Sequence, residues 1–424
     1  MRRERIVLLL FIFFLITINY GDRVALSVGS KAVADEFHLS PVQMGYLLSS
    51  FSWTYVIFLI PWGTAADRVG PRLVTMIGMA LWSSATVVTG FAANLTSLFG
   101  ARLLMGASEA SAFPATGRLI RGWVPRSQFG IANMIAISGG YAGPAIGAVV
   151  FGWLASLFGW RGGFIAVGCT GFLWILLAAF WFHKPADAPA APVAVMAQEE
   201  TGSIAGFGRL LASPSLWGLF LTQGACVYAH YLHLTWLPNY LQTTRHLTIM
   251  KTGLFTSLPF GISVFGSLGL AMLSDYILGH AGDQTGRRRW MVAIMMVVSA
   301  VIVLLPFVDN IWGVVAIFTI ALTGTSAATG LNSALLTDQL VSPSDAGKGH
   351  AVLVVGGNIF GTLAPIVTGY VIADTGSFDA TWYFCGALLI AGALVVLNFT
   401  KGPVGAPRGG DMASRKIQAS LRGD

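Results

Sequence analysis

Charged residues are scarce in this chain. They make up 10% of its 424 residues, while hydrophobic residues make up 55% and the mean hydropathy is +0.72. Because soluble domains carry about 25% charged residues, this composition excludes an ordinary soluble protein and predicts an integral protein of the lipid bilayer. A net charge of +7 would suit a nucleic-acid surface only if the basic residues gathered on one face, and their positions, given below, do not support that.

Cysteine is also rare. Cys169, Cys226 and Cys385 each lie within an apolar run, at spacings that fit neither a disulfide framework nor a metal site. The chain also has no clustered ligand spacing such as H-x-x-x-H with an acid, so a membrane-embedded enzyme is the less favoured class. We expect no metal, no cofactor and no enzymatic activity.

The opening basic residues and apolar run lack the small-x-small cleavage site of a signal peptide, so we interpret the run as a retained first span. A span needs about 20 predominantly apolar residues. On this basis the sequence predicts an all-α membrane protein with twelve transmembrane helices. They lie near residues 6–29, 41–63, 73–93, 97–119, 128–156, 161–182, 214–241, 252–278, 290–308, 311–336, 348–373 and 380–399.

A stretch rich in Ala, Pro, Gly and Ser, residues 186–208, separates the sixth predicted span from the seventh. It divides the chain into two halves of six spans, which is typical of transporters built from two repeats. We therefore predict a six-helix bundle in residues 1–183, a cytoplasmic linker in residues 184–210, a second six-helix bundle in residues 211–400 and a cytoplasmic tail in residues 401–424.

The basic residues indicate how the spans are oriented. An even number of spans places both termini on one side, and the segments on the cytoplasmic side carry an excess of Lys and Arg. With a cytoplasmic N-terminus, most of the 25 Lys and Arg residues fall in inner segments, and the outer loops hold only Lys31, Arg161, Arg245 and Lys251. The basic surplus is thus explained by topology, and no nucleic-acid partner is implied.

An acid and a base, Asp22 and Arg23, stand side by side in the first predicted span. A charge in hydrocarbon costs about 2.5–3.5 kcal/mol on insertion scales, so such residues usually face a cavity or a partner. Asn19, Asp22 and Arg23 share one helix face by their i, i+3, i+4 spacing. The alternative is that the span ends at Ile18 and the pair anchors it among the headgroups, but apolar residues resume after Arg23.

The fourth predicted span contains a second base and acid, Arg102 and Glu109. They are seven residues apart and therefore lie on one helix face, about 10 Å apart along the axis. Since they are too distant to satisfy each other, each needs a partner on another helix, and Asp22 and Arg23 are the other charges at comparable depth. We predict that all four converge on one cavity. The alternative is a purely structural charge quartet, which is a poor source of stability.

The loop after the second predicted span has the pattern G-x-x-x-D-R-x-G-x-R. Gly63 and Gly70 permit a close helix contact and a tight turn, and Asp67 is placed to pair with a base or a helix N-terminus. Arg68 and Arg72 complete the pattern. It resembles the signature loop of the major facilitator superfamily, and the sequence is similar to that family throughout its length. We expect these five residues to form a cytoplasmic gate loop.

Three further motifs resemble the anion:cation symporter family, especially its bacterial proton-coupled sugar-acid carriers. The first is Tyr20-x-Asp22-Arg23, and the second is R-x-x-x-G-x-x-E-x-x-x-x-P from residue 102 to residue 114. The third is the W-L-P-x-Y-L sequence at residues 236–241. The resemblance implies a bacterial inner-membrane protein with both termini in the cytoplasm, and we expect it to be a monomer.

The same resemblance implies roles for individual residues. Arg23 would hold the substrate carboxylate, Asp22 and Glu109 would carry protons, and Arg102 would pair with an acid or attract the anion. Further substrate contacts would come from Tyr20, Tyr55 and Asn358. One departure concerns the substrate: Gly140 in the fifth predicted span offers only backbone where some sugar-acid carriers place a large amide side chain.

The second half of the chain has a different chemistry. His230 and His233 in the seventh predicted span are neutral groups suited to contact substrate hydroxyls, although both are alternatively interface residues bonded to nearby backbone. A degenerate copy of the gate loop follows the eighth predicted span, with Asp275 and the basic residues 287–289. The preferred interpretation is a proton-coupled symporter of a sugar acid, such as a hexonate or hexuronate, that works by alternating access. The alternatives are a symporter of aromatic or other carboxylates and an organic anion exchanger.

Overall fold

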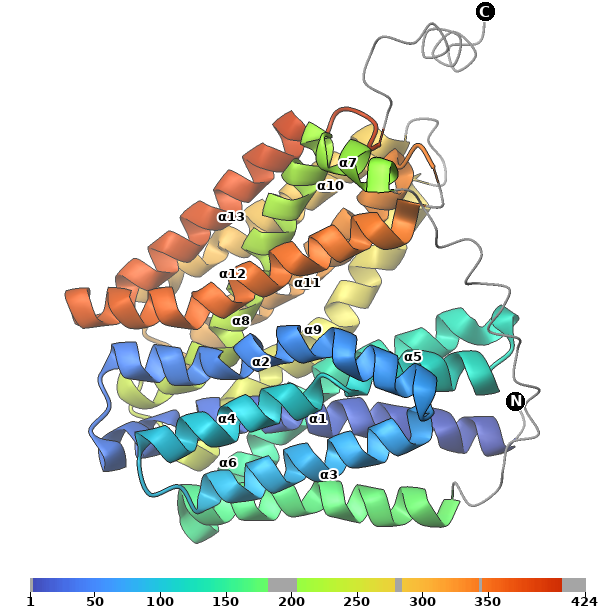
Figure 1. Ribbon diagram of the computed structural model, residues 1–424. Helices are drawn as coiled ribbons and strands as arrows, with labels where there is room; N and C mark the ends of the chain where they lie inside the picture. Colours follow the sequence, from blue (N-terminus) through green and yellow to red (C-terminus); the bar gives the residue numbers. More distant parts are fainter. Residues whose placement is uncertain (1–2, 182–203, 279–283, 343–344, 406–424) are drawn as a thin grey trace, which may run out of the picture.

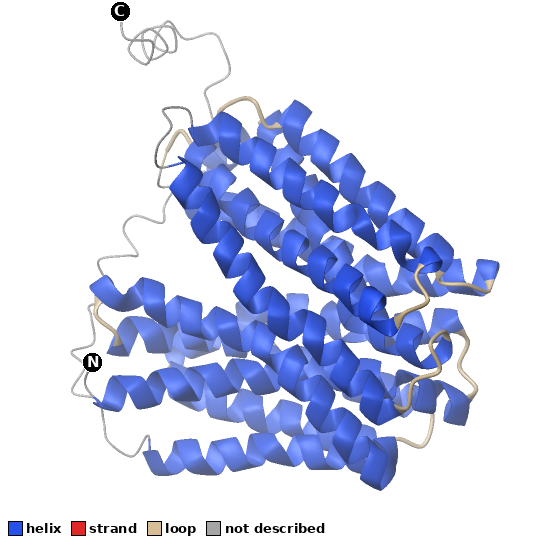
Figure 2. Cartoon of the chain, turned by 180° about the vertical axis from the view of Figure 1, so that it is seen from behind, coloured by secondary structure: helices blue, strands red, loops and turns tan. Residues whose placement is uncertain are grey.

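The computed structural model describes residues 3–181, 204–278, 284–342 and 345–405, and this part of the chain is built from helices joined by short loops (Figures 1 and 2). The predicted all-α class is confirmed. The helices are α1 (Arg3–Phe37), α2 (Pro41–Arg68), α3 (Pro71–Gly90), α4 (Leu95–Glu109), α5 (Ala112–Trp123), α6 (Phe129–Trp181), α7 (Ile204–Leu211), α8 (Pro214–Thr243), α9 (Ile249–Leu278), α10 (Gln284–Ser299), α11 (Ile311–Gln339), α12 (Ala346–Thr375) and α13 (Asp379–Phe399), with 3-10 turns at Arg126–Gln128 and Ala300–Phe307.

Nine of the described helices are long and apolar enough to cross a membrane, by length and composition. These nine account for ten of the twelve predicted spans, because one of them holds two, and the remaining two predicted spans correspond to helices outside the nine. Helix α6 holds two spans, and α4 and α5 together form one interrupted span. Helix α8 has 30 residues and is long enough to cross a bilayer of about 30 Å, although it carries more polar side chains than its neighbours.

The division of α6 into two arms occurs at Gly159. This residue has φ 69° and ψ 170°, and a positive φ of this kind is available to glycine without a steric penalty. The chain reverses here, so that the rings of Phe151 and Phe164 pack edge to face with centroids 4.9 Å apart. The predicted boundary between the fifth and sixth spans, near residues 157–160, therefore coincides with the observed turn.

The interruption between α4 and α5 follows directly after Glu109. Pro114 lacks a backbone N–H, so the carbonyl one turn earlier, at Ala110, loses its regular helical partner. The first of these helices ends at Glu109 and the second begins at Ala112. The sequence predicted one continuous span here, and the break places the Glu109 carboxylate at the end of a helix inside the bundle.

Helices α1 to α6 pack against one another in a first bundle, and α8 to α13 pack in a second bundle, drawn below and above in Figure 1. Residues 182–203 and 406–424, which include most of the predicted linker and tail, lie outside the described residues. Within the predicted linker the short helix α7 is described. The exact domain boundaries therefore stay predictions.

The bundles approach each other closely at the end that carries the loops at residues 38–40, 244–248 and 376–378, which we call the closed end. Small residues make this approach possible. A Cβ atom on Gly45 of α2 would lie 2.5 Å from the Pro365 oxygen of α12, and one on Gly253 of α9 would lie 2.3 Å from the Ala148 oxygen of α6.

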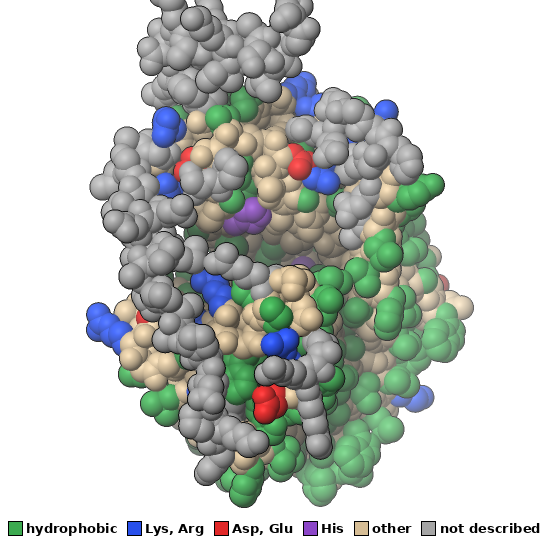
Figure 3. All heavy atoms as spheres, turned by 90° about the vertical axis from the view of Figure 1, so that its right-hand side faces the viewer, with side chains coloured by type: hydrophobic (Ala, Val, Ile, Leu, Met, Phe, Trp, Pro, Cys, Tyr) green, Lys and Arg blue, Asp and Glu red, His purple; other side chains and the backbone are tan. Residues whose placement is uncertain are grey.

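Hydrogen bonds between the bundles also gather at the closed end. Asn239 Nδ2 of α8 donates to Ser30 Oγ of α1 at 3.1 Å, and Gln242 Nε2 donates to the Val28 oxygen at 2.8 Å. Toward the other end, which carries the start of α1 and the α2–α3 loop and which we call the open end, the bundles diverge. The space-filling view onto this end shows a surface hollowed between the two bundles (Figure 3).

Candidate functional site

Helix α1 continues without a break through its polar residues to Phe37. Asn19, Asp22 and Arg23 are 0%, 1% and 5% exposed. The alternative in which the span ends at Ile18 and the charged pair lies among headgroups is therefore wrong. The prediction that the three residues share one buried helix face is confirmed.

Arg23 and Glu109 form a buried ion pair across α1 and α4. Arg23 Nε donates to Glu109 Oε2 at 2.7 Å, and the two side chains are 3% and 0% exposed. Asn19 Oδ1, one turn earlier on α1, accepts a hydrogen bond from Arg23 Nη2 at 2.9 Å. This arrangement fixes the plane of the guanidinium group, because a planar donor held at two atoms cannot rotate freely.

Three aromatic rings enclose the same guanidinium group. Its Cζ atom lies 4.4 Å from the ring centroid of Tyr20, 4.5 Å from that of Phe51 and 4.9 Å from that of Tyr55. A cation in this position is attracted by the electron-rich ring faces, and more strongly where water is excluded. Arg23 thus keeps its charge in the bundle interior through an acid, an amide and three rings.

Asp22 and Arg102 form the second part of the charge cluster. Both are buried, and their charges interact with each other and with Glu109. Among the described residues, however, neither carboxylate oxygen of Asp22 has a hydrogen-bond partner, and Arg102 contacts Met105 Sδ through Nη1 rather than forming an ion pair. The four charges converge as the sequence predicted, but only Arg23 and Glu109 are joined by a hydrogen bond.

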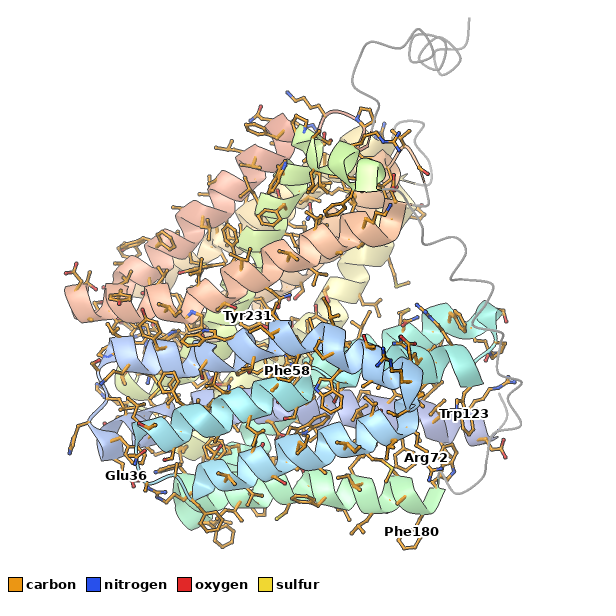
Figure 4. All side chains as sticks on the ribbon, in the orientation of Figure 1. Glu36, Phe58, Arg72, Trp123, Phe180 and Tyr231 are labelled. Atoms are coloured by element: carbon orange, nitrogen blue, oxygen red, sulfur yellow. The ribbon has the colours of Figure 1, made fainter. Side chains whose placement is uncertain are left out.

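The second bundle contributes residues that face this cluster. Tyr231 of α8 packs against the group of Phe51 and Tyr55, at the boundary between the bundles where Figure 4 labels it. Its neighbour His230 contacts Tyr141 of α6 edge to face, with ring centroids 6.4 Å apart. The site therefore has walls from both bundles.

Two other predicted residues lie apart from Arg23. His233 is fully buried within the second bundle, where its Nδ1 contacts the Ala229 oxygen and its ring lies against Phe318. Asn358 of α12 is half-buried and donates from Nδ2 to the Val354 oxygen at 2.9 Å. His233 is thus better described as a residue between helices that bonds to nearby backbone than as a substrate contact beside Arg23. His230, in contrast, lies at the boundary between the two bundles.

Phe51 is a member of the site that sequence reasoning missed. Its ring contacts both inner arginines, with centroid distances of 4.5 Å to Arg23 Cζ and 5.6 Å to Arg102 Cζ. The available signal was its position four residues before Tyr55, which places both rings on one helix face. Tyr141 was missed in the same way, although it follows Gly140 directly.

The predicted gate loop lies at the open end. Gly70 has φ 91°, which explains the need for glycine there, and Gly63 faces Pro114 of α5. Asp67 accepts a hydrogen bond from Arg118 Nε at 2.5 Å and pairs with it through a second guanidinium nitrogen. Arg68 and Arg72, the two basic residues of the pattern, lie at the end of α2 and the start of α3.

A corresponding pair exists in the second bundle. Arg288 near the start of α10 pairs with Asp338 near the end of α11. In the first bundle the acid lies in the last turn of α2 and the base in α5, whereas here the base lies near the start of α10 and the acid near the end of α11. The side chain of Asp275, the acid of the predicted degenerate copy, lies outside the described residues.

Comparison with known proteins agrees with this architecture. The family described as Major Facilitator Superfamily matches residues 12–280 and 276–421. A probable galactarate/D-glucarate transporter of Bacillus subtilis (strain 168) is 32% identical, over 93% of this chain and 92% of its own length. One from Escherichia coli (strain K12) is 30% identical, over 94% and 95%. The D-galactonate transporter of Escherichia coli O6:H1 is 28% identical, over 93% and 95%.

A solved structure has the same fold. It is the crystal structure of a bacterial homolog to the human lysosomal transporter Spinster, in an inward-facing and unoccupied conformation. The TM-score is 0.74 with 20% sequence identity, over 94% of this chain and 95% of that chain. At this identity the likeness concerns the fold alone, and it agrees with the predicted arrangement of two six-helix bundles.

Proposed function

This chain belongs to the major facilitator superfamily, and we propose that it carries a sugar-acid anion together with protons by alternating access. Its relatives are named as transporters, so the expectation of a transporter rather than an enzyme is confirmed. Their names include galactarate, D-glucarate and D-galactonate, which supports a small hydroxylated carboxylate as the substrate. We further propose a monomer in the bacterial inner membrane that needs no cofactor other than the coupled proton.

The observation that carries this proposal is the buried ion pair between Arg23 and Glu109. A guanidinium group presents two parallel N–H donors that match a carboxylate, and here one acid of the protein already occupies Nε. A substrate carboxylate has the same shape and charge as the Glu109 group, so it is suited to compete for Arg23. Tyr20 and Tyr55, which contact the guanidinium group, are placed beside an anion bound there.

Competition of this kind couples substrate to protons. When a substrate anion occupies Arg23, Glu109 loses its counter-ion in a buried place, and a proton then binds to it more readily. The loaded site, with one anion and one added proton, has the same net charge as the empty ion pair. Asp22, whose buried oxygens have no hydrogen-bond partner among the described residues, is a second candidate proton carrier. Linkage requires that proton and substrate favour each other's binding equally.

The arrangement of the bundles supports alternating access. They touch at the closed end and diverge at the open end, and transporters of this class rock two halves about a central site. A cytoplasmic location of both termini, which the distribution of basic residues predicts, would make the open end the cytoplasmic side and this arrangement an inward-facing one. Asp67 and Arg118 then lie on the cytoplasmic side.

An aromatic carboxylate is the second candidate substrate. The ring set of Tyr20, Phe51 and Tyr55 around Arg23 favours it, because aromatic rings pair well with one another. The two classes are separated by thermal-shift measurements on the purified chain with sugar acids and with aromatic acids. Stabilisation by aromatic acids alone would favour this second candidate.

Glu109→Gln tests the coupling step. The amide imitates the protonated acid, so the variant should bind substrate and exchange it across the membrane but fail to concentrate it with a pH gradient. Counterflow and gradient-driven uptake are measured in proteoliposomes containing the parent or the variant. A reduction of uphill accumulation to the level without a gradient is expected, with counterflow within about threefold of the parent.

Glu36→Gln is the matched control for this experiment. Glu36 lies near the end of α1, where it accepts hydrogen bonds from Trp160 Nε1 at 2.7 Å and from Arg161 Nη2 at 2.6 Å, and it is exposed. This variant should accumulate substrate like the parent. If Glu109→Gln also accumulates substrate uphill, Glu109 is not the coupling site.

A further inference from the structure

The buried charged side chains are unevenly divided between the first and the second bundle. Among the described residues, the buried charged side chains are Asp22, Arg23, Arg102 and Glu109, and all four belong to α1 and α4. Helix α8 contains no charged residue between Pro214 and Thr243. The basic residues of the described second half lie near helix ends or in connecting segments, at Arg209, Arg245, Lys251, Arg287, Arg288, Arg289, Lys348 and Lys401.

A line of contacts leads from Arg23 to the opposite wall. The guanidinium carbon is 4.4 Å from the centroid of Tyr20, and a Cβ atom on Gly140 would lie 3.5 Å from Cε2 of that ring. Tyr141 is the next residue on α6, and its ring reaches His230 of α8. A substrate held at Arg23 and extended along this line meets neutral side chains.

Hydrogen-bonding groups are available on that wall. Ser326 of α11 places its buried Oγ beside the Tyr141 side chain. His230 and Tyr231 add an imidazole and a phenol, both only partly buried. These groups donate to and accept from hydroxyls, and none supplies a permanent positive charge.

We propose that this site, in the transport function proposed above, selects sugar acids with a single carboxylate over those with a carboxylate at both ends. The carboxylate binds at Arg23, beside Tyr231, and the hydroxylated tail faces His230 and Ser326. A second carboxylate at the tail would leave water without meeting a cation, and an unpaired buried charge is strongly unfavourable. The chain would thus differ in preference from its relatives named for galactarate and D-glucarate.

Arg102 does not supply the missing second cation. It belongs to the same bundle as Arg23, is 2% exposed, and interacts with Met105 and the charge of Asp22. Its guanidinium group also contacts the Phe51 ring that contacts Arg23. It therefore lies on the carboxylate side of the site, away from the wall formed by α8.

D-Galactonate and galactarate form a matched pair of probes, because they share one carbon configuration and differ at the terminal carbon, which is an alcohol in one and a carboxylate in the other. Both are titrated calorimetrically into the purified full chain. We expect galactonate to bind at least about tenfold more tightly, consistent with the cost of an unpaired charge. Equal or tighter binding of galactarate would overturn the selectivity while leaving sugar-acid transport intact. Binding of neither acid would overturn the proposed function, and the selectivity with it.

His230→Lys tests the wall directly. A lysine there places a cation opposite Arg23, so the affinity for galactarate relative to galactonate should rise about tenfold or more. His230→Gln, which adds no charge, is the matched control and should not raise this ratio. The folded state of each variant is checked by its melting temperature. An unchanged ratio in folded His230→Lys would show that the tail does not face His230, and if this variant does not fold, the ratio in the parent chain still decides the selectivity.

Discussion

Arg23 makes contacts that depend on the shape of its guanidinium group as well as on its charge. Nε bonds to Glu109 while Nη2 bonds to Asn19, and a lysine ammonium on a flexible chain cannot reproduce both directions together with the ring contacts. Arg23→Lys should therefore lower substrate affinity at least about tenfold, or about 1.4 kcal/mol, in a calorimetric titration.

Arg161→Lys provides the control for Arg23→Lys. Arg161 also pairs with an acid, Glu36, but near the membrane surface, where its side chain is 36% exposed. Exposed pairs contribute little to stability, so this variant should bind substrate like the parent. Equal affinities for Arg23→Lys and the parent would show that the carboxylate is held elsewhere.

The convergence of the inner charges was predictable from the sequence because a buried charge without a partner is costly. The partner of Glu109 was also predictable, because Arg102 is too distant on the same face and Arg23 is the other base at this depth. The arrangement of the other two charges was not predictable, because the sequence does not show that Arg102 contacts Met105 instead of forming an ion pair with Asp22. Phe51 was missed because a phenylalanine in an apolar helix is equally suited to the core or to lipid, and its spacing from Tyr55 was the one sequence signal of its place at the site.

At the scale of the element, the last turn of α2 is connected to α5 through Asp67 and Arg118. Both side chains are partly exposed, at 61% and 30%, so the pair should add little to stability. It lies at the open end, where the bundles must meet for the site to open to the other side. Asp67→Asn should slow initial uptake about tenfold in proteoliposomes while the substrate affinity stays within about twofold of the parent.

Asp35→Asn is the comparison for Asp67→Asn. Asp35 pairs with Lys31 on one face of α1, at 2.5 Å, and both side chains are exposed at the closed end. Its loss should leave both rate and affinity unchanged. Lost affinity with an unchanged rate in Asp67→Asn would place Asp67 in binding rather than in the conformational change.

The structural features predicted best were those that depend only on residues close together in the sequence. The turn at Gly159 followed from a short gap between two apolar runs, and the tight turn at Gly70 followed from its motif. The break after Glu109 was missed, although Pro114 was visible, because a proline in a membrane helix produces either a mild bend or a full interruption. The surrounding packing decides between them, and that information is not local.

At the scale of the whole molecule, one of the contacts at the closed end is a crossing of α2 and α12 in which the two backbones approach closely. Gly45 meets the Pro365 oxygen of α12, and one turn along, Gly369 of α12 meets the Pro41 oxygen of α2. The Pro365 oxygen also accepts a hydrogen bond from Trp236 Nε1 at 3.2 Å. The sequence showed glycine and proline within these helices, but which pairs meet depends on how the two bundles dock.

Gly45→Val tests whether this crossing holds the molecule in its present state. Its Cβ would lie 2.5 Å from a backbone oxygen, too close to be tolerated without a shift, so the closed end must separate. A mutation shifts a two-state equilibrium when it changes the free energy of one state more than that of the other. Each ~1 kcal/mol of this difference changes the ratio of the two populations about fivefold. The open end should then close in a larger fraction of molecules.

The distance between spin labels at Gly117 of α5 and Gly347 of α12 reports on this change. Both positions have open space around them and lie on different bundles toward the open end, and Cys169→Ser removes the one exposed native cysteine. Gly45→Val should increase the population with a short distance between labels. Gly100→Val is the control, because its Cβ would meet nothing within 4 Å, and it should leave the distribution unchanged. If Gly45→Val also leaves the distribution unchanged, the crossing of α2 and α12 does not set the balance between the two states, and the contacts of α1 with α8 and of α6 with α9 must hold the end closed.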